Sequence, residues 1–325
     1  MVMANTTKKN KLWIFLVMGI LALALLVTLW FIPDKQETVK SQENKDYHEK
    51  IVDQKRYTYD SSIVSILFMG IDTKDSEKLG QADMLDLVLL NRDQETMQVV
   101  SISRDTMTKI HLFDVEHHSL GWDTQHLALA YTYGDSHQNG ATLTRQAVSK
   151  LLLDVPIVHF AAMDLGKLPL VQEIVGQLEV VVPNDSLVDM EPAWQTGNKI
   201  ILTKDNVETF VRTRDIEQDY SNQDRMERQK AYLNAYMEKM KQMLSENFEK
   251  TVGVLYNVCK QMTTNITIEN VEAFANMLLT YTYDEKADFM TLPGTNQTTE
   301  VHDEFIVDQP ALEKFVLDLF YKEEN

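Results

Sequence analysis

An uninterrupted apolar run near the start of the chain most constrains how the protein can fold. Residues Leu12 to Ile32 read LWIFLVMGILALALLVTLWFI, 21 residues without a charge. At about 1.5 Å per residue, a helix of this length spans roughly 30 Å, the thickness of the hydrocarbon core of a bilayer. A buried helix of a soluble core would not usually be apolar on every face. The run therefore predicts a transmembrane helix.

Charges beside this run predict its orientation. Lys8, Lys9 and Lys11 precede it, and positive charge favours the cytoplasmic side. The run is longer than the core of a typical signal peptide, and no clear small-x-small cleavage site follows it. We therefore expect an uncleaved signal anchor in the cell membrane: a cytoplasmic N-terminus over residues 1–11, a single span over 12–32, and an extracytoplasmic remainder.

The remainder divides into a polar linker and one large domain. Residues 33–62 are polar and mixed in charge without an apolar period, which predicts a linker or stalk. Residues 63–325 are long enough for one large domain, and an apolar content of 44% supplies a packed core. The single cysteine, Cys259, excludes an intrachain disulfide and a cysteine-based zinc finger. The net charge of −18 argues against nucleic acid as a partner.

Short apolar runs alternate with longer helical patterns through this domain. We expect strands at 63–71, 84–91, 97–103, 156–163, 178–182 and near Phe289, with the turn RDQET joining the second and third. We expect helices at 124–133, 141–152, 165–175, 204–212, 224–249, 268–279 and 310–321. Strands interleaved with helices predict an α/β fold, an α/β/α sandwich with a central mixed β-sheet.

The first three strands should bring charged side chains to one edge of the sheet. If strand 63–71 runs upward, Asp72 lies at its top, the next strand starts there near Asp83, and the third returns Arg104 and Asp105 to the same edge. Ligands commonly bind at strand ends in open α/β sheets. Two carboxylates suit a magnesium ion that keeps water and phosphate oxygens as its other ligands. Ordinary turn aspartates would explain the same residues.

Half of the arginines cluster in a second segment, VRTRDIEQDYSNQDRMERQ. Of the eight arginines in the chain, four fall here: Arg212, Arg214, Arg225 and Arg228. The first two end a predicted helix, where cations are favoured. The last two lie in the first turn of the next helix, where a cation is disfavoured unless an anion binds, and they share a face with Gln229. This pattern predicts a phosphate or pyrophosphate cradle. The alternative is a set of salt bridges to Glu217, Asp219, Asp224 and Glu227.

The histidines form no metal motif by their spacing. Five of them lie within 27 residues: His111, His117, His118, His126 and His137. No pair among them has the i, i+4 spacing of a helical zinc motif, and no cysteine is nearby. We expect these to be solvated loop histidines.

Taken in order, the motifs resemble a known family, the LytR-CpsA-Psr proteins of the bacterial cell envelope. The resemblance runs from about Ile63 to Gln229 through LFMGID, GQAD, SISRDT, LALAYTYG, VRTRD and DRMERQ, and an N-terminal anchor followed by an ectodomain matches the layout of the family. It implies a magnesium-dependent phosphotransferase. Such an enzyme would move an anionic glycopolymer, for example teichoic acid or capsule, from a polyprenyl-pyrophosphate carrier to a peptidoglycan hydroxyl and release polyprenyl phosphate.

The resemblance also implies roles for individual residues. Asp72 and Asp83 would hold Mg²⁺. Asp105 would position the network or transfer a proton, and it would complete the catalytic set with Arg104 and the two metal ligands. Pyrophosphate would be bound by Arg104, Arg212, Arg214, Arg225, Arg228 and Gln229.

Three departures from the family pattern bear on the strength of catalysis. Gln81 stands where an arginine is common, Ala128 stands where an asparagine is common, and Asn222-Gln223-Asp224 lacks the usual glycine turn before Arg225. Two other functions stay open. One is a non-catalytic scaffold that binds polyprenyl pyrophosphate and regulates envelope assembly. The other is a lipid pyrophosphate hydrolase, in which water replaces the sugar hydroxyl.

Overall fold

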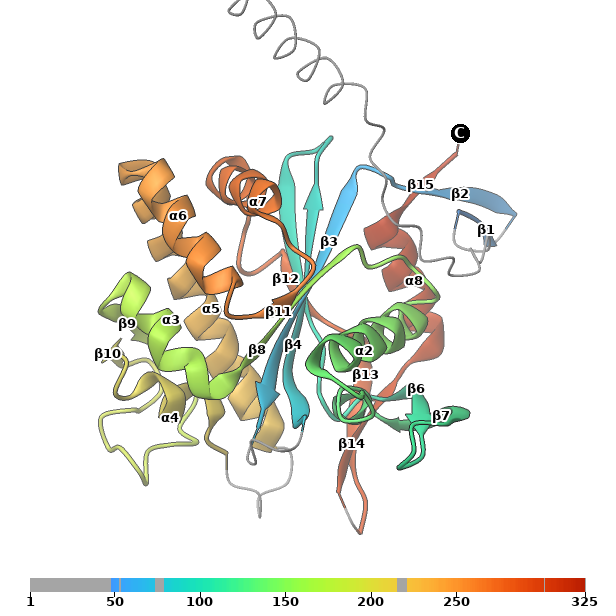
Figure 1. Cartoon of the computed structure of the whole chain (residues 1–325), viewed down its shortest axis with the longest axis horizontal. Coiled ribbons are helices and arrows are strands. Elements are labelled where there is room, and N and C mark those ends of the chain that lie inside the picture. The colour runs from blue at the N-terminus through green and yellow to red at the C-terminus, as the bar shows by residue number, and fades with distance from the viewer. Residues whose placement is uncertain (1–47, 53, 74–78, 215–220, 301, 325) are drawn as a thin grey trace, which may run out of the picture. The chain divides into compact units, whose positions relative to one another are not determined.

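A mixed six-stranded β-sheet lies at the centre of the computed structural model, which describes residues 48–52, 54–73, 79–214, 221–300 and 302–324 (Figure 1). In spatial order its strands are β11 (Thr263–Thr264), β8 (His159–Asp164), β3 (Ile63–Asp72), β4 (Gln81–Asn91), β5 (Thr96–Ser101) and β12 (Phe289–Thr291). The pairs β3/β8 and β5/β12 are parallel, and the other three are antiparallel. The expected α/β fold with a mixed sheet is confirmed.

Helices cover both faces of this sheet, which is why β3 and β4 are nearly continuously apolar. On one face, α2 (His137–Leu151) and α8 (Gln309–Phe320) pack in the largest core with Leu67 and Leu87. On the other, α5 (Ser221–Glu246) and α7 (Ile268–Thr280) pack over Ile66 and Leu90. Figure 1 shows the two helix layers on either side of the sheet. Strands buried on both faces read as apolar runs instead of alternating patterns.

A second core positions the arginine-rich segment beside the sheet. It joins η3 (Leu165–Lys167), α3 (Leu168–Val175), β9 (Leu178–Val181), β10 (Lys199–Leu202), α4 (Val207–Arg212) and the start of α5. Phe210 and Val211 of α4 are buried in it, as is Tyr232 of α5. The same packing therefore holds the end of α4 and the first turns of α5, where the arginines lie. The helix α6 (Phe248–Cys259) packs farther along α5.

Several elements differ from the sequence-based expectations. The expected helix at 124–133 is wrong: Ser119–His126 forms strand β7, paired with β6 (Met107–Phe113), and only Leu127–Ala130 is helical, as a 3-10 turn. The expected helix at 224–249 ends at Glu246, and Asn247 caps the separate helix α6 by accepting a hydrogen bond from the Lys250 backbone N–H. The hairpin of β13 (Gly294–Thr298) and β14 (Asp303–Val307) was not expected, because its sequence is mostly polar.

The folded domain starts earlier than the sequence predicts. Strands β1 (Glu49–Val52) and β2 (Lys55–Tyr59) lie within the predicted linker 33–62, and they pair in a three-stranded sheet with β15 (Tyr321–Glu323). Val52, Tyr57 and Tyr59 pack against the main core, whereas the neighbouring side chains are exposed, which hides the strand signal. The domain therefore begins no later than Glu49.

The predicted cytoplasmic segment 1–11 and the predicted span 12–32 lie outside the described residues. Among the residues that the structure does describe, no helix combines the length and hydrophobicity required to cross a bilayer.

Candidate functional site

Charged side chains gather where β4 begins and β5 ends. The Arg104 guanidinium, just after β5, forms an ion pair with Asp83 Oδ1 and donates a hydrogen bond to Gln81 Oε1. Its Nε lies 3.5 Å from Asp105 Oδ1. Asp83, Arg104 and Asp105 thus converge at one edge of the sheet, as their places on the hairpin predict. Gln81, noted as a departure from the family pattern, here holds Arg104.

The start of α5 completes this cluster from the other side. Because α5 already includes Ser221, Arg225 and Arg228 lie beyond its first turn, and the prediction that they occupy the first turn is wrong. Arg225 Nη1 lies 3.1 Å from Asp83 Oδ2, and its Nη2 donates to Asn222 Oδ1 at 2.8 Å. Asn222 Nδ2 in turn donates to Asp105 Oδ2 at 2.8 Å and to Ser103 Oγ at 3.1 Å. We call the closed set of Asp83, Arg104, Asp105, Asn222 and Arg225 the Asp83 network.

The Asp83 network holds its charges away from water. Arg225 is only 3% exposed, and burial lowers the pKa of its guanidinium, an effect that the Asp83 carboxylate opposes. Asp83 and Asp105 are buried as well. Both terminal nitrogens of Arg225 have partners, so Asp83 and Asn222 fix its position, whereas its Nε is buried without a hydrogen bond to a described residue. Asn222 was not expected as a site residue; its spacing of three from Arg225, on one helical face, is the signal that could have found it.

Asp72 pairs with a different arginine at the same edge of the sheet. Arg212 Nη2, at the end of α4, lies 2.6 Å from Asp72 Oδ1, and its other nitrogen binds Glu208. Asp72 is the strand partner of Gln81, which connects this pair to the Asp83 network. A carboxylate that the sequence reasoning did not include, Asp164, ends the neighbouring parallel strand β8 and accepts hydrogen bonds from Thr73 and from the Gly166 backbone N–H.

Arg228 and Gln229 bind the chain itself. Arg228 is 1% exposed; its Nε donates to Phe210 O at 2.8 Å, and its other nitrogens donate to Thr213 O and Ser186 Oγ. Gln229 Nε2 donates to Val211 O at 3.3 Å. Both side chains therefore anchor the end of α4, next to Arg212. Their predicted contact with pyrophosphate stays a prediction.

Arg214 is the least engaged of the clustered arginines. It forms no hydrogen bond or ion pair with the residues that the structure describes. Burial is the main cause of the lowered pKa of Arg225, and the charges of Arg104 and Arg214 add to it. The alternative partners Glu217 and Asp219 lie outside the described residues. The structure pairs Arg225 with Asp83 instead of Asp224 or Glu227.

The carboxylate oxygens of Asp72 and Asp83 are the kind of ligand atom that a magnesium ion prefers. Mg²⁺ prefers oxygen ligands and commonly keeps water and substrate phosphate beside one or two carboxylates. In this structure both oxygens of Asp83 and one oxygen of Asp72 contact guanidinium groups. A cation here would share these oxygens with three arginines, so its binding should depend on an anionic ligand that offsets their charge.

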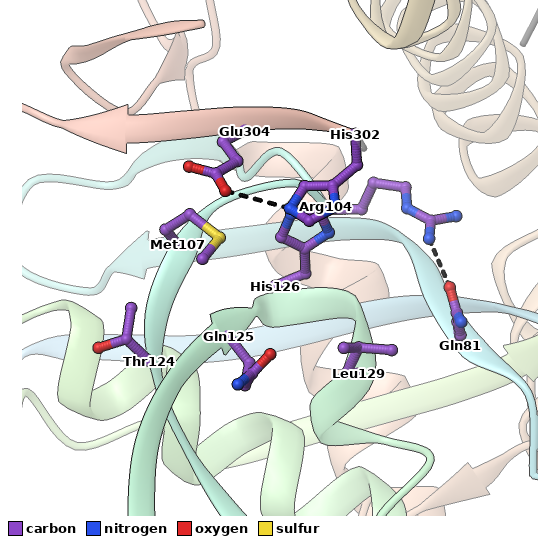
Figure 2. A pocket seen from close by; sticks show the side chains of 9 residues that line it. All are labelled: Gln81, Arg104, Met107, Thr124, Gln125, His126, Leu129, His302 and Glu304. Atoms are coloured by element: carbon purple, nitrogen blue, oxygen red, sulfur yellow. Dashed lines mark hydrogen bonds and ion pairs between the residues drawn. The ribbon is translucent and has the colours of Figure 1, made fainter. Parts of the chain in front are cut away.

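A polar pocket opens beside the Asp83 network. It has a volume of about 440 Å³ and is lined by Gln81, Arg104, Met107, Thr124, Gln125, His126, Leu129, His302 and Glu304. Figure 2 shows Arg104 reaching Gln81 in this pocket, with His126, His302 and Glu304 gathered beside it. The Arg104 side chain keeps 15% exposure, so a ligand in the pocket can reach a guanidinium of the network.

Asp86, also on β4, lies outside the Asp83 network and allows a separate test of how burial changes the pKa of a carboxyl group. It is 3% exposed, and burial raises the pKa of its carboxyl to about 6 from an ordinary 3.8, with a Ser101 hydrogen bond opposing the shift. Because the folded-state pKa is the higher one, the proton is held more tightly in the folded state. The free energy of unfolding should therefore fall as the pH rises from about 4 to 6, and the loss should persist above that range.

We accordingly expect Asp86→Asn to stabilise the protein at pH 8 by up to about 3 kcal/mol and to have little effect at pH 4. Urea unfolding of the wild-type protein and the variant at both pH values measures this. A stability difference that is the same at pH 4 and pH 8 would contradict the assigned pKa.

Comparison with known proteins identifies the family of the chain. Residues 29–319 match the LytR_cpsA_psr family model. Polyisoprenyl-teichoic acid–peptidoglycan teichoic acid transferase TagU of Bacillus cereus is 30% identical over 155 residues, which are 47% of this chain and 45% of the relative. The transferase TagV of Bacillus subtilis is 25% identical over 299 residues, 86% of this chain and 71% of the relative. The match to the first relative thus spans less than half of its length.

Solved structures share the fold. The crystal structure of B. subtilis TagV superimposes with a TM-score of 0.62 at 24% identity, covering 79% of this chain and 96% of TagV. A structure described as TagT bound to LI-WTA has a TM-score of 0.59 at 21% identity and covers 80% of this chain and 90% of TagT.

Proposed function

Because the chain belongs to the LytR-CpsA-Psr family, we propose that it is a cell-envelope phosphotransferase that takes a glycopolymer from a polyprenyl-pyrophosphate carrier and attaches it to peptidoglycan. The names of the TagU and TagV relatives support teichoic acid as the class of polymer. We also propose that the apolar run 12–32 anchors the protein in the cell membrane with the domain outside.

The observation that carries the proposal is the pairing of two guanidinium groups with one buried carboxylate. Arg104 and Arg225 hold separate oxygens of Asp83, and Arg104 also faces the polar pocket. Planar guanidinium groups bind phosphate oxygens with two donors each, and fixed donors in a water-poor site stabilise the charge that develops during phosphoryl transfer. The network thus presents cationic groups in a fixed arrangement to a pyrophosphate.

In the proposed reaction the protein mainly positions the reactants and stabilises charge. The oxygen of the acceptor hydroxyl attacks the phosphorus that carries the glycan, the bond from that phosphorus to the bridging oxygen breaks, and polyprenyl phosphate leaves with the bonding electron pair. The hydroxyl proton passes to a base. Arg104, which faces the pocket, would bind the phosphate oxygens with the charge of Arg225 behind it, and Arg212 and Arg214 would add charge for the leaving phosphate. When bound at Asp72 and Asp83, Mg²⁺ would neutralise further phosphate charge.

Asp83 and Asp105 position the arginines in this proposal. Asp83 contacts both guanidinium groups, and Asp105 contacts Arg104 Nε while Asn222 holds its other oxygen. Donors whose positions are fixed before substrate arrives need no reorganisation during the reaction. Gln81 also serves this purpose, so its replacement of a common arginine removes one cation and keeps a hold on Arg104.

The test uses the full chain in detergent with a synthetic polyprenyl pyrophosphate oligosaccharide, magnesium and peptidoglycan fragments. We expect mass spectrometry to find the oligosaccharide joined to peptidoglycan by a phosphodiester, at a yield that depends on the protein. Free oligosaccharide phosphate that forms equally well without peptidoglycan would indicate a hydrolase instead. Tight lipid binding without any product would indicate a scaffold.

A further inference from the structure

On the wall of the pocket, one histidine meets a histidine and a glutamate from a distant part of the sequence. His126 ends strand β7, while His302 and Glu304 lie at the start of β14. The His126 and His302 rings are 4.4 Å apart between centroids and nearly perpendicular, and His302 Nε2 lies 3.1 Å from Glu304 Oε1. Figure 2 shows the three side chains pointing toward one another.

The backbone explains why these side chains meet. His302 and Glu304 are two residues apart in extended chain, so their side chains leave the same face. His126 is the strand partner of Met107, and β14 pairs with the same segment through the Thr106–Phe305 bridge and a 2.9 Å hydrogen bond from the Phe305 backbone N–H to Asp105 O. The cluster therefore spans the two strands that flank residues 105–107.

One nitrogen of the cluster lacks a partner. His126 Nε2 is buried without a hydrogen bond to any of the described residues. A buried polar atom without a partner costs free energy, and an ion bound at this position would supply the partner. Asp105 and Glu304 add negative charge around His126, and Arg104 adds one positive charge. Because Asp105 already contacts Arg104, Glu304 is the carboxylate left to share a cation with the two imidazoles.

We infer that His126, His302 and Glu304 bind a divalent transition-metal ion of the zinc class. Two imidazoles and one carboxylate are a donor set that zinc takes in sites where the fourth position is left to water or substrate. The candidate ligand atoms all lie within 4.8 Å of one another. At bond lengths near 2.0 to 2.2 Å, tetrahedral ligands lie roughly 3.4 Å apart, so the His302–Glu304 contact already fits and the other ligand atoms must approach by at most about 1.4 Å.

The cluster can close by that amount because one of its sides is exposed. The side chains of His302 and Glu304 are 45% and 21% exposed, so both can turn toward the half-buried His126. The fourth position would face the pocket that also exposes Arg104. This site is separate from the proposed magnesium ligands Asp72 and Asp83, and its existence does not depend on the proposed transferase activity.

A second group of possible ligands serves as an internal control. Asp114, Glu116 and His118 also lie close together, and His118 Nδ1 is 3.1 Å from Asp114 Oδ2. Asp114 Oδ1 already accepts hydrogen bonds from the Glu116 and His118 backbone N–H groups, and the His118 side chain is 78% exposed. This arrangement is a solvated turn, so we expect it to bind zinc weakly.

The experiment uses the full chain, free of any histidine tag, stripped with chelator and titrated with Zn²⁺ and with Co²⁺ as a spectroscopic probe. We expect one tightly bound ion per chain and visible Co²⁺ bands typical of a four- or five-coordinate nitrogen and oxygen site. His302→Ala and Glu304→Gln should each weaken zinc binding by about 100-fold or more, since removing even an outer-shell partner costs 10- to 100-fold. His118→Ala should leave the affinity unchanged.

Thermal unfolding without metal distinguishes lost ligands from lost fold. Both pocket variants should melt as the wild-type protein does in chelator, and only the wild-type protein and His118→Ala should gain thermal stability from added zinc. The inference would be overturned by a wild-type chain that binds no zinc at micromolar concentration. It would equally be overturned if His302→Ala and Glu304→Gln kept the wild-type affinity, or if His118→Ala lost it.

Discussion

The Asp83→Asn variant should lose glycopolymer transfer by about 100- to 1,000-fold and still bind the pyrophosphate lipid, because one fixed transition-state donor is worth roughly that factor in rate and Asp83 fixes two of them. Asp83 touches both Arg104 and Arg225, and it is a proposed magnesium ligand. An asparagine keeps the size of the side chain but removes the charge that holds two guanidinium groups. The arginines remain present, and with less negative charge beside them their attraction for phosphate should not fall.

Asp93→Asn is the matched control for this prediction. Asp93 is 67% exposed and pairs with Lys322, so the same chemical change should leave transfer intact. Product formation by mass spectrometry and binding of a fluorescent polyprenyl pyrophosphate provide the two readouts, with circular dichroism as the check on folding. Wild-type turnover in Asp83→Asn would refute the role of Asp83. Joint loss of binding and turnover in a folded variant would show that Asp83 acts in binding instead.

The Arg228→Ala variant should lose about 3 kcal/mol of stability or more, because each buried acceptor left unpaired costs roughly 1–3 kcal/mol. Arg228 is among the largest fully buried side chains of the described domain. It donates to Phe210 O and Thr213 O at the end of α4 and to Ser186 Oγ between β9 and β10. Alanine would leave these acceptors unpaired and a cavity between them.

Arg214→Ala is the matched control, since it removes the same charge from the same cluster. Arg214 makes no hydrogen bond or ion pair within the described part of the chain, so its loss should barely change stability and should weaken binding of the pyrophosphate lipid. Urea unfolding and lipid titration of both variants measure the two effects. Equal stability of Arg228→Ala and the wild-type protein would show that Arg228 is free to serve the ligand, as its sequence position suggests.

The contrast between Arg225 and Arg228 shows how far the sequence predicts this site. Both lie in the early part of one helix, on one face and three residues apart, so sequence spacing assigns them a single role. The structure separates them: Arg225 points to Asp83 on the sheet, whereas Arg228 points to the end of α4. Sequence spacing predicts the side of the helix from which a side chain leaves. Which neighbouring element the side chain then contacts depends on tertiary packing.

The fold was predictable where burial makes the sequence periodic. The apolar strands β3, β4 and β5 and their hairpin follow from runs that are covered on both faces. The hairpin of β6 and β7 was missed because Ser119–His126 is mostly exposed and carries no alternation of apolar side chains. Because this hairpin was missed, the cluster of His126, His302 and Glu304 was missed too. His302 lies 176 positions after His126 in the sequence, and the two histidines share no sequence motif.

The small sheet that joins both ends of the described domain has a mechanical consequence. β1 is the edge strand of this sheet and pairs with β2, whereas β2 is also paired with β15 on its other side. Asp60, just after β2, adds a 2.8 Å backbone hydrogen bond to Phe320 O and a 3.0 Å ion pair with Lys322. Glu49 pairs with Thr58 at the open end of the β1–β2 hairpin, so tension applied there peels β1 away one pair at a time. The chain from Glu49 to the start of β2 would then release roughly 20 Å at about 3.4 Å per residue, and β15 would act as the stop before the load reaches β3 and the Asp83 network.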